Sequence, residues 1–193
     1  MEDKLTYDGF LSTLSSEQWK RIGIKRRSGA AVPLFSIYSS KSIGIAELPD
    51  ISLLVDWCKT TGMSLIQLLP LNDVGFNFRP YDSQSTFAID PMYLSLNELI
   101  GIDIRLYKSE LKKIKSAFPT GTKRVNYGIK SAKLGLLWKI FGDISLENVT
   151  AFTDFIKDNS FWLEDYALFK VIKEKHSEMA PEGWSEDLKH RNS

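Results

Sequence analysis

The sequence predicts an α/β protein that contains only part of a larger sheet. A strand, a helix and a second strand follow one another within roughly 40 residues, which is the pattern of a βαβ unit with parallel strands. The second half of the chain shows helical periodicity instead. Two parallel strands cannot close a barrel, because a (β/α)8 barrel needs eight strands and about 250 residues. We therefore expect further strands beyond Ser193.

The chain begins with an expected leader, residues 1–25, in which one short helix packs on the rest of the protein. Ser15, with Gln18 three positions later, has the spacing of a capping box that opens such a helix. The first strand is expected over residues 30–38, where a short apolar run has β-branched residues near its centre and precedes a serine-rich turn.

A helix and a second strand complete the βαβ part of the chain, residues 26–94. The helix is expected over residues 49–62, because a Pro-Asp pair suits its first turn and a glycine ends it. Its apolar stripe consists of Ile51, Leu54, Val55 and Cys58. Residues 64–71 are almost continuously apolar up to a proline, as expected for a parallel strand covered on both faces.

Residues 95–193 are expected to form a helical subdomain without strands. The signals are a capping box at Ser95 and Glu98 with an apolar stripe over residues 104–118, and two further helical patterns over residues 125–141 and 161–175. Lysines fill the face opposite the first stripe, which indicates a solvent-exposed surface.

Composition excludes several classes of function. The 193 residues carry 25 Lys and Arg against 24 Asp and Glu, so no strong field favours nucleic acid or an anionic membrane. Cys58 is the single cysteine, and the two histidines, His176 and His190, are far from it in sequence, so we expect no internal disulfide, metal or cofactor. No apolar run reaches the length of a signal peptide or a membrane span, and we expect a cytoplasmic protein.

The most informative segment is the loop of residues 72–91, which directly follows the second predicted strand. Loops after the carboxyl ends of parallel strands build the active sites of barrel enzymes. This loop is longer than the usual connection of roughly 2 to 6 residues. It mixes aromatic with polar side chains, the combination that a sugar ring requires; its aromatic residues are Phe76, Phe78, Tyr81 and Phe87. The alternative is that Phe78 and Phe87 only anchor the loop.

At these residues the sequence resembles the 4-α-glucanotransferases, the amylomaltase or disproportionating-enzyme family, glycoside hydrolase family 77. Pro80-Tyr81-Asp82-Ser83-Gln84-Ser85 is the motif at the centre of this resemblance. Further matching segments are residues 27–30, 42–45, 55–57, 67–71, 87–91 and 162–169. The similarity runs in order over roughly residues 20 to 190, without large gaps.

The resemblance implies the first two strands of a (β/α)8 barrel followed by an inserted helical subdomain. It also implies retaining transglycosylation, in which two carboxyl groups about 5 to 5.5 Å apart flank the scissile bond of an α-1,4-glucan. In the family these catalytic carboxylates lie on later strands, so none is expected in this chain. Tyr81 matches the tyrosine that lines the donor-sugar subsite. Further candidate substrate-binding residues are Phe76, Asp82 and Arg79, the last of which replaces a serine found in many relatives.

Two other functions stay open at this point. The chain could be a truncated, non-catalytic module that binds glucan or another protein, or the front of another α/β carbohydrate enzyme such as a hydrolase. Asp56, Cys58 and the pair Glu164-Asp165 are interpreted as structural, since none lies beside a second group that would complete a catalytic site.

Overall fold

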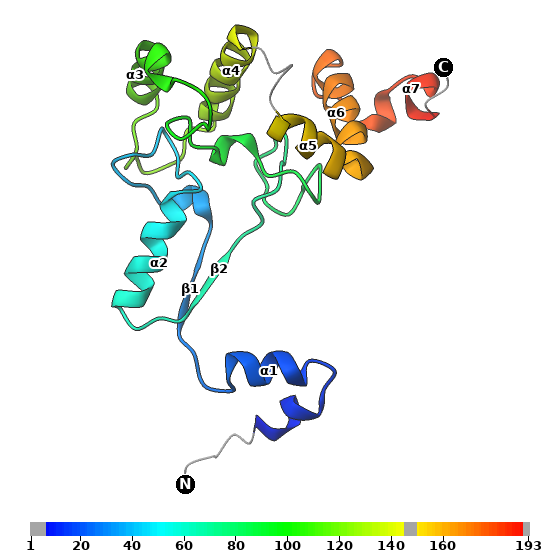
Figure 1. The fold of residues 1–193 in the computed structure, drawn as a ribbon. Helices are drawn as coiled ribbons and strands as arrows, with labels where there is room; N and C mark the ends of the chain where they lie inside the picture. Colours follow the sequence, from blue (N-terminus) through cyan, green and yellow to red (C-terminus); the bar gives the residue numbers. More distant parts are fainter. Residues whose placement is uncertain (1–6, 145–149, 191–193) are drawn as a thin grey trace.

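The fold is given by a computed structural model that describes residues 7–144 and 150–190. Two strands, β1 (Gly29–Val32) and β2 (Leu65–Leu68), pair in parallel, with Gly29 opposite Leu65 and Val32 opposite Leu68. Helix α2 (Asp50–Thr60) connects them and lies beside the pair (Figure 1). The predicted βαβ unit is therefore confirmed.

The first strand is shorter than the sequence predicts. It ends at Val32, because Pro33 has no N–H group with which to continue the ladder. The N–H of Ser36 then donates to the carbonyl of Pro33 at 2.9 Å, and a 3-10 turn, η2 (Leu34–Ser36), buries Leu34 completely. The prediction of strand structure up to Tyr38 is wrong for this segment.

The strands are also less covered than the apolar run at residues 64–71 predicts. Exposure alternates along β2, and the side chain of Leu65 is 49% exposed. One helix can cover only one face of a two-stranded sheet. The prediction of a strand covered on both faces is therefore wrong for the described residues.

Helix α2 has the predicted position, with Pro49 directly before it and Asp50 in its first turn. The Asp50 carboxylate accepts hydrogen bonds from the Ser42 hydroxyl and from the N–H of Glu47, both at 2.7 Å, and so ties the preceding loop to the helix. Cys58 is buried as predicted. Val55 is 46% exposed, so the predicted apolar stripe is wrong at that position.

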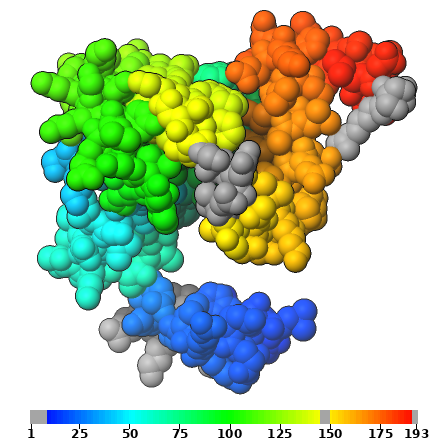
Figure 2. Space-filling model, turned by 45° about the horizontal axis from the view of Figure 1, so that its top comes forward, coloured from blue at the N-terminus to red at the C-terminus, as the bar shows by residue number. Residues whose placement is uncertain are grey.

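Residues 1–6 of the expected leader lie outside the described residues. Its described part folds as a short 3-10 helix, η1 (Tyr7–Ser12), and helix α1 (Ser16–Ile22), which pack on each other. The rings of Phe10 and Trp19 lie 4.8 Å apart between centroids. Figures 1 and 2 show this unit standing apart from the rest of the protein, contrary to the expectation that it packs on the body. Ser15 makes no side-chain capping bond, so the predicted capping box is wrong.

From Pro91 on, the regular elements of the described residues are helices, as predicted for residues 95–193. These elements are η3 (Pro91–Tyr93), η4 (Ile104–Tyr107), α3 (Lys108–Ala117), α4 (Gly128–Asp143), α5 (Thr150–Asp158), α6 (Ser160–Lys175), η5 (Pro181–Gly183) and α7 (Glu186–His190). Helices α3, α4 and α6 confirm three predictions, whereas α5 and α7 were not predicted. Ser95 does not open a helix: it is buried, and α3 begins only at Lys108, after η4.

An apolar cluster joins the βαβ part of the chain to α4. Its buried members are Leu34, Ile43, Ile45, Ala46, Met92, Tyr93, Leu96, Tyr107, Ile129, Leu136 and Ile140. Gly44 has φ +75°, and a Cβ atom there would lie 2.7 Å from Cδ1 of Ile129. The backbone therefore approaches α4 as closely as a residue without a side chain allows.

Candidate functional site

Backbone hydrogen bonds join the two ends of the loop of residues 72–91. Asn72 and Ile89 form an antiparallel bridge. On either side of it, the N–H of Asp73 donates to the carbonyl of Ala88 at 2.9 Å, and the N–H of Asp90 donates to that of Leu71 at 2.8 Å. Because both strands run toward the helical part, this loop lies against helices from the second half of the chain (Figure 1).

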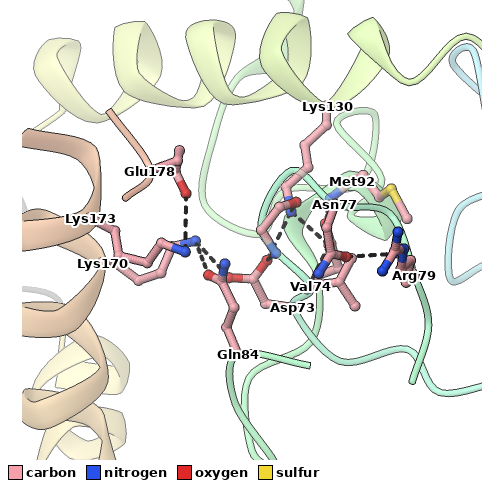
Figure 3. Close-up of polar contacts among 12 residues, drawn as sticks. Asp73, Val74, Asn77, Arg79, Gln84, Met92, Lys130, Lys170, Lys173 and Glu178 are labelled. Atoms are coloured by element: carbon pink, nitrogen blue, oxygen red, sulfur yellow. Dashed lines mark hydrogen bonds and ion pairs between the residues drawn. The ribbon is translucent and has the colours of Figure 1, made fainter. Parts of the chain in front are cut away.

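Lys130, from the first turn of α4, binds the base of the loop through a buried ammonium group. Its Nζ lies 2.8 Å from Oδ1 of Asp73 and 2.7 Å from Oδ2 of Asp90, and it donates to the carbonyl of Gly75 at 2.5 Å. The three side chains are at most 1% exposed. Figure 3 shows Lys130 extending from α4 toward Asp73. One lysine thus connects both ends of the loop.

Helix α6 binds the same aspartate from another side. The hydroxyl of Tyr166 donates to Oδ2 of Asp73 at 2.6 Å, and Nζ of Lys170 lies 2.9 Å from that oxygen. Lys170 also donates to Oε1 of Gln84 at 3.1 Å (Figure 3). The carboxylate of Asp73 therefore joins the loop to two helices.

The charged network sets the protonation of its members. Burial by itself would raise the pKa of Asp73, but the hydrogen bonds from Lys130, Tyr166 and Lys170 outweigh it and hold that pKa well below its usual range. Burial raises the pKa of Asp90 despite the opposing charge of Lys130. Burial and the Asp73 carboxylate together raise the pKa of the Tyr166 phenol, which stays a hydrogen-bond donor.

Replacing Asp73 with asparagine should lower the free energy of unfolding by about 3 kcal/mol at neutral pH, because the buried Lys130 would lose a charged partner. The folded-state pKa of Asp73 lies below its ordinary value of 3.8, so this stabilisation is present above that value and is lost as the pH falls toward the folded-state pKa. The difference between wild type and Asp73→Asn should therefore shrink from about pH 5 to pH 2, measured by urea unfolding. A constant difference would contradict the ion pairing.

A second buried pair holds the segment that leaves the loop. Nζ of Lys133 lies 2.6 Å from Oε1 of Glu47 and donates to the carbonyls of Met92 and Leu94 at 2.9 and 3.1 Å. Burial raises the pKa of Glu47 and lowers that of Lys133, while each group opposes the shift of the other. Helix α4 thus binds the loop through Lys130 and its continuation through Lys133.

Two aromatic side chains anchor the loop, as the alternative interpretation of Phe78 and Phe87 predicts. The ring of Phe78 stacks on that of Tyr127, with centroids 4.3 Å apart and 20° between the planes. The ring of Phe87 stacks on Trp162 of α6 at 5.4 Å and 20°. Beside this second stack, residues 83–87 and α6 line an open pocket of about 450 Å³.

Three of the four predicted substrate-binding residues lie at the tip of the loop, residues 79–82. Tyr81 is 75% exposed, and Nη1 of Arg79 lies 3.5 Å from Oδ2 of Asp82, with both side chains largely exposed. Phe76 is 41% exposed and lies edge-on to Phe78, with centroids 6.1 Å apart. The structure therefore places Arg79, Tyr81 and Asp82 together at the tip and Phe76 closer to the base.

The paired carboxylates of the site do not have the environment of a retaining catalytic pair. Asp73 and Asp90 contact the same ammonium group, but both are at most 1% exposed, so a glycosidic bond could not reach them. Asp56 is exposed on α2. Within residues 7–144 and 150–190, no group of three or more His, Cys, Asp or Glu could hold a metal ion. No helix in the same part of the chain is long and apolar enough to cross a membrane.

The sequence interpretation missed the residues that hold the loop, namely Lys130, Lys133, Tyr166 and Lys170. One signal was present: Lys133 is four positions after Ile129 and three before Leu136, on the predicted apolar stripe of this helix. A lysine at such a position needs a buried partner. The identity of that partner, Glu47, has no local signal in the sequence.

An α/β chain with a long, firmly held loop that exposes an aromatic ring among polar groups has the mixed apolar and polar surface of a small-molecule binding site. The sequence model of the 4-alpha-glucanotransferases, glycoside hydrolase family 77, matches residues 32–193. The chain therefore belongs to this family.

Curated relatives agree with this assignment. The chain is 37% identical to a 4-alpha-glucanotransferase of Chlamydia pneumoniae over 164 residues, which is 82% of the chain and 31% of the relative. It is 37% identical to the rice protein named 4-alpha-glucanotransferase DPE2 over 163 residues, 77% of the chain and 16% of the relative. For the Aquifex aeolicus 4-alpha-glucanotransferase the identity is 36% over 141 residues, 71% and 27%. The chain thus spans about a third or less of these relatives.

Proposed function

We propose that the chain is the substrate-loop part of a 4-alpha-glucanotransferase, which transfers α-1,4-glucan segments between maltooligosaccharides by retaining transglycosylation. The observation that carries this proposal is the contrast within one loop. Its base is fixed by buried ion pairs, while Tyr81 at its tip is 75% exposed. An aromatic ring held on a rigid support can stack on a sugar ring without losing much conformational freedom on binding.

In this proposal Tyr81 stacks on the donor glucose next to the scissile bond. Nη1 of Arg79 lies 3.5 Å from Oδ2 of Asp82. These two exposed side chains would form hydrogen bonds with glucan hydroxyls on either side of the Tyr81 ring. Phe76, half-exposed at the base of the same loop, adds a second apolar face. The three polar or aromatic side chains at the tip would act together on one sugar.

We further propose that the βαβ unit forms the first two strands of a (β/α)8 barrel and that residues 95–193 form an inserted helical subdomain. The exposed face of the strands and the threefold greater length of the Chlamydia pneumoniae relative support this arrangement. The catalytic aspartate and glutamate would then lie on later strands.

Replacing Tyr81 with alanine should weaken maltoheptaose binding to the chain about tenfold, because a lost stacking face of roughly 1.5 kcal/mol corresponds to that factor. Isothermal titration calorimetry measures the effect. Phe141→Ala is the matched control, since Phe141 is an exposed aromatic residue in the last turn of α4, outside the loop of residues 72–91. Equal affinities of wild type and Tyr81→Ala would contradict the role of Tyr81.

Purified residues 1–193 should not convert maltotriose into glucose and longer oligomers, because the proposed catalytic carboxylates belong to other strands. Chromatography of the products after prolonged incubation tests this expectation. Disproportionation by the chain alone would overturn the assignment of catalysis to later strands. Glucan binding without turnover would agree with both the proposed enzyme and a non-catalytic binding module. A longer version of the protein that includes further strands distinguishes them, because only the enzyme would convert maltotriose.

A further inference from the structure

We infer that Asp73 is a positioning residue for glucan binding: through its carboxylate, helices α4 and α6 together set the geometry of the loop tip that carries Tyr81. The glucan in this inference rests on the proposed function. The coupling between helices and tip rests on the contacts of the described residues alone.

The carboxylate of Asp73 has four partners. Its Oδ1 atom accepts from Lys130 at 2.8 Å and from the N–H of Gly75 at 2.9 Å. Its Oδ2 atom accepts from Tyr166 at 2.6 Å and lies 2.9 Å from Nζ of Lys170. A carboxylate with four partners in fixed directions has one orientation available to it.

Asp73 also binds the backbone at both ends of the segment that contains Tyr81, at Gly75 and at Gln84. The carboxylate holds the N–H of Gly75, while the backbone carbonyl of Asp73 accepts from the N–H of Gln84 at 2.7 Å. Residues 76–83, with Tyr81 among them, lie between these two amides. Any displacement of Asp73 therefore moves both ends of the segment that presents Tyr81.

The conformation between these ends is constrained. Gly75 has φ +60°, and a Cβ atom there would lie 2.1 Å from Nε2 of Gln84. Phe78 has φ +57°, a left-handed conformation that is costly for a bulky residue and persists only where surrounding contacts impose it. Pro80 then restricts the backbone immediately before Tyr81. The tip therefore depends on its supports for its shape.

The chemical nature of the support favours a positioning role. Buried ion pairs add little net stability compared with well-packed apolar residues, because desolvation offsets their attraction. They differ from apolar contacts in fixing direction and distance. A site that must hold an aromatic ring in one place needs that directionality.

The test is a pair of matched hydroxyl deletions. Tyr166→Phe removes a hydroxyl that donates to Asp73, whereas Tyr107→Phe removes one that donates to Asp143 at 3.0 Å, away from the loop. Lys170→Met is the second variant, since Lys170 is 29% exposed and its loss leaves no buried cavity. The measurements are amide hydrogen exchange over residues 72–91 and calorimetric binding of maltoheptaose.

We expect Tyr166→Phe and Lys170→Met to accelerate exchange within residues 75–84 about tenfold and to weaken maltoheptaose binding several-fold, with unchanged exchange in α3. Tyr107→Phe should change neither the loop exchange nor the binding. Unchanged loop exchange in both Tyr166→Phe and Lys170→Met would overturn the inference, and so would faster exchange with unaltered affinity. Equal effects of Tyr107→Phe would overturn it as well, because the role of Asp73 would then be general stability.

The two proposals fail in different ways. If the unaltered chain does not bind maltoheptaose, the proposed function is contradicted for residues 1–193, and so is the glucan part of the inference. The exchange rates of residues 75–84 still decide whether Asp73 couples the helices to the tip, since that measurement needs no ligand.

Discussion

Replacing Lys130 with methionine should destabilise the protein by roughly 3–5 kcal/mol, because it leaves two buried carboxylates without their shared ammonium group. Asp73 and Asp90 each contact Nζ of Lys130 within 2.8 Å, and neither is more than 1% exposed. Methionine has a similar length and fills much of the same volume, so the expected effect comes from charge rather than from a cavity. Urea unfolding at neutral pH measures it.

The control for this change is Lys139→Met, on the same helix. Lys139 pairs with Glu110, but its side chain is 51% exposed, and water can replace the lost partner. The unfolding midpoint of Lys139→Met should be close to that of the wild type. If the two variants are equally stable, the Lys130 cluster does not hold the loop as the geometry indicates.

Replacing Ile129 with alanine should lower the free energy of unfolding by about 2–5 kcal/mol, the range for a large apolar side chain removed from a core. Ile129 is completely buried and precedes Lys130 directly in α4. Its side chain faces Gly44, where the backbone already approaches as closely as it can. The surrounding structure therefore has little freedom to close the cavity.

Ile100→Ala is the matched control for the core variant, because Ile100 is fully exposed. Thermal and urea unfolding of the two variants should differ widely, with Ile100→Ala indistinguishable from the wild type. A small effect of Ile129→Ala would mean that the core beneath α4 is less tightly packed than its burial indicates.

These two predictions concern one helix with two functions. Ile129 faces the apolar core, while Lys130 faces the charged base of the loop. Consecutive residues on a helix point about 100° apart, so adjacent positions can serve different neighbours. The position of α4 therefore determines both the stability of the core and the placement of the proposed sugar-binding loop.

The sequence alone predicted the features that depend on local patterns. Apolar residues at helical spacing indicated α2, α3, α4 and α6, and the short apolar runs indicated the parallel pair of strands. The aromatic and polar composition of residues 72–91 identified the loop as the candidate site, and the motif around Tyr81 indicated the family to which the chain belongs. Periodicity and motif spacing are properties of neighbouring residues, which is why one sequence suffices for them.

Only the tertiary structure decided how the loop is held. Lys130 and Lys170 meet Asp73 across 57 and 97 positions of sequence, and Lys133 meets Glu47 across 86. A lysine on an apolar stripe, as at Lys133, indicates that a buried partner exists, but nothing in the local pattern selects which residue it is. The choice is made when packing removes water from both charges, because each then requires an opposite charge within hydrogen-bonding distance.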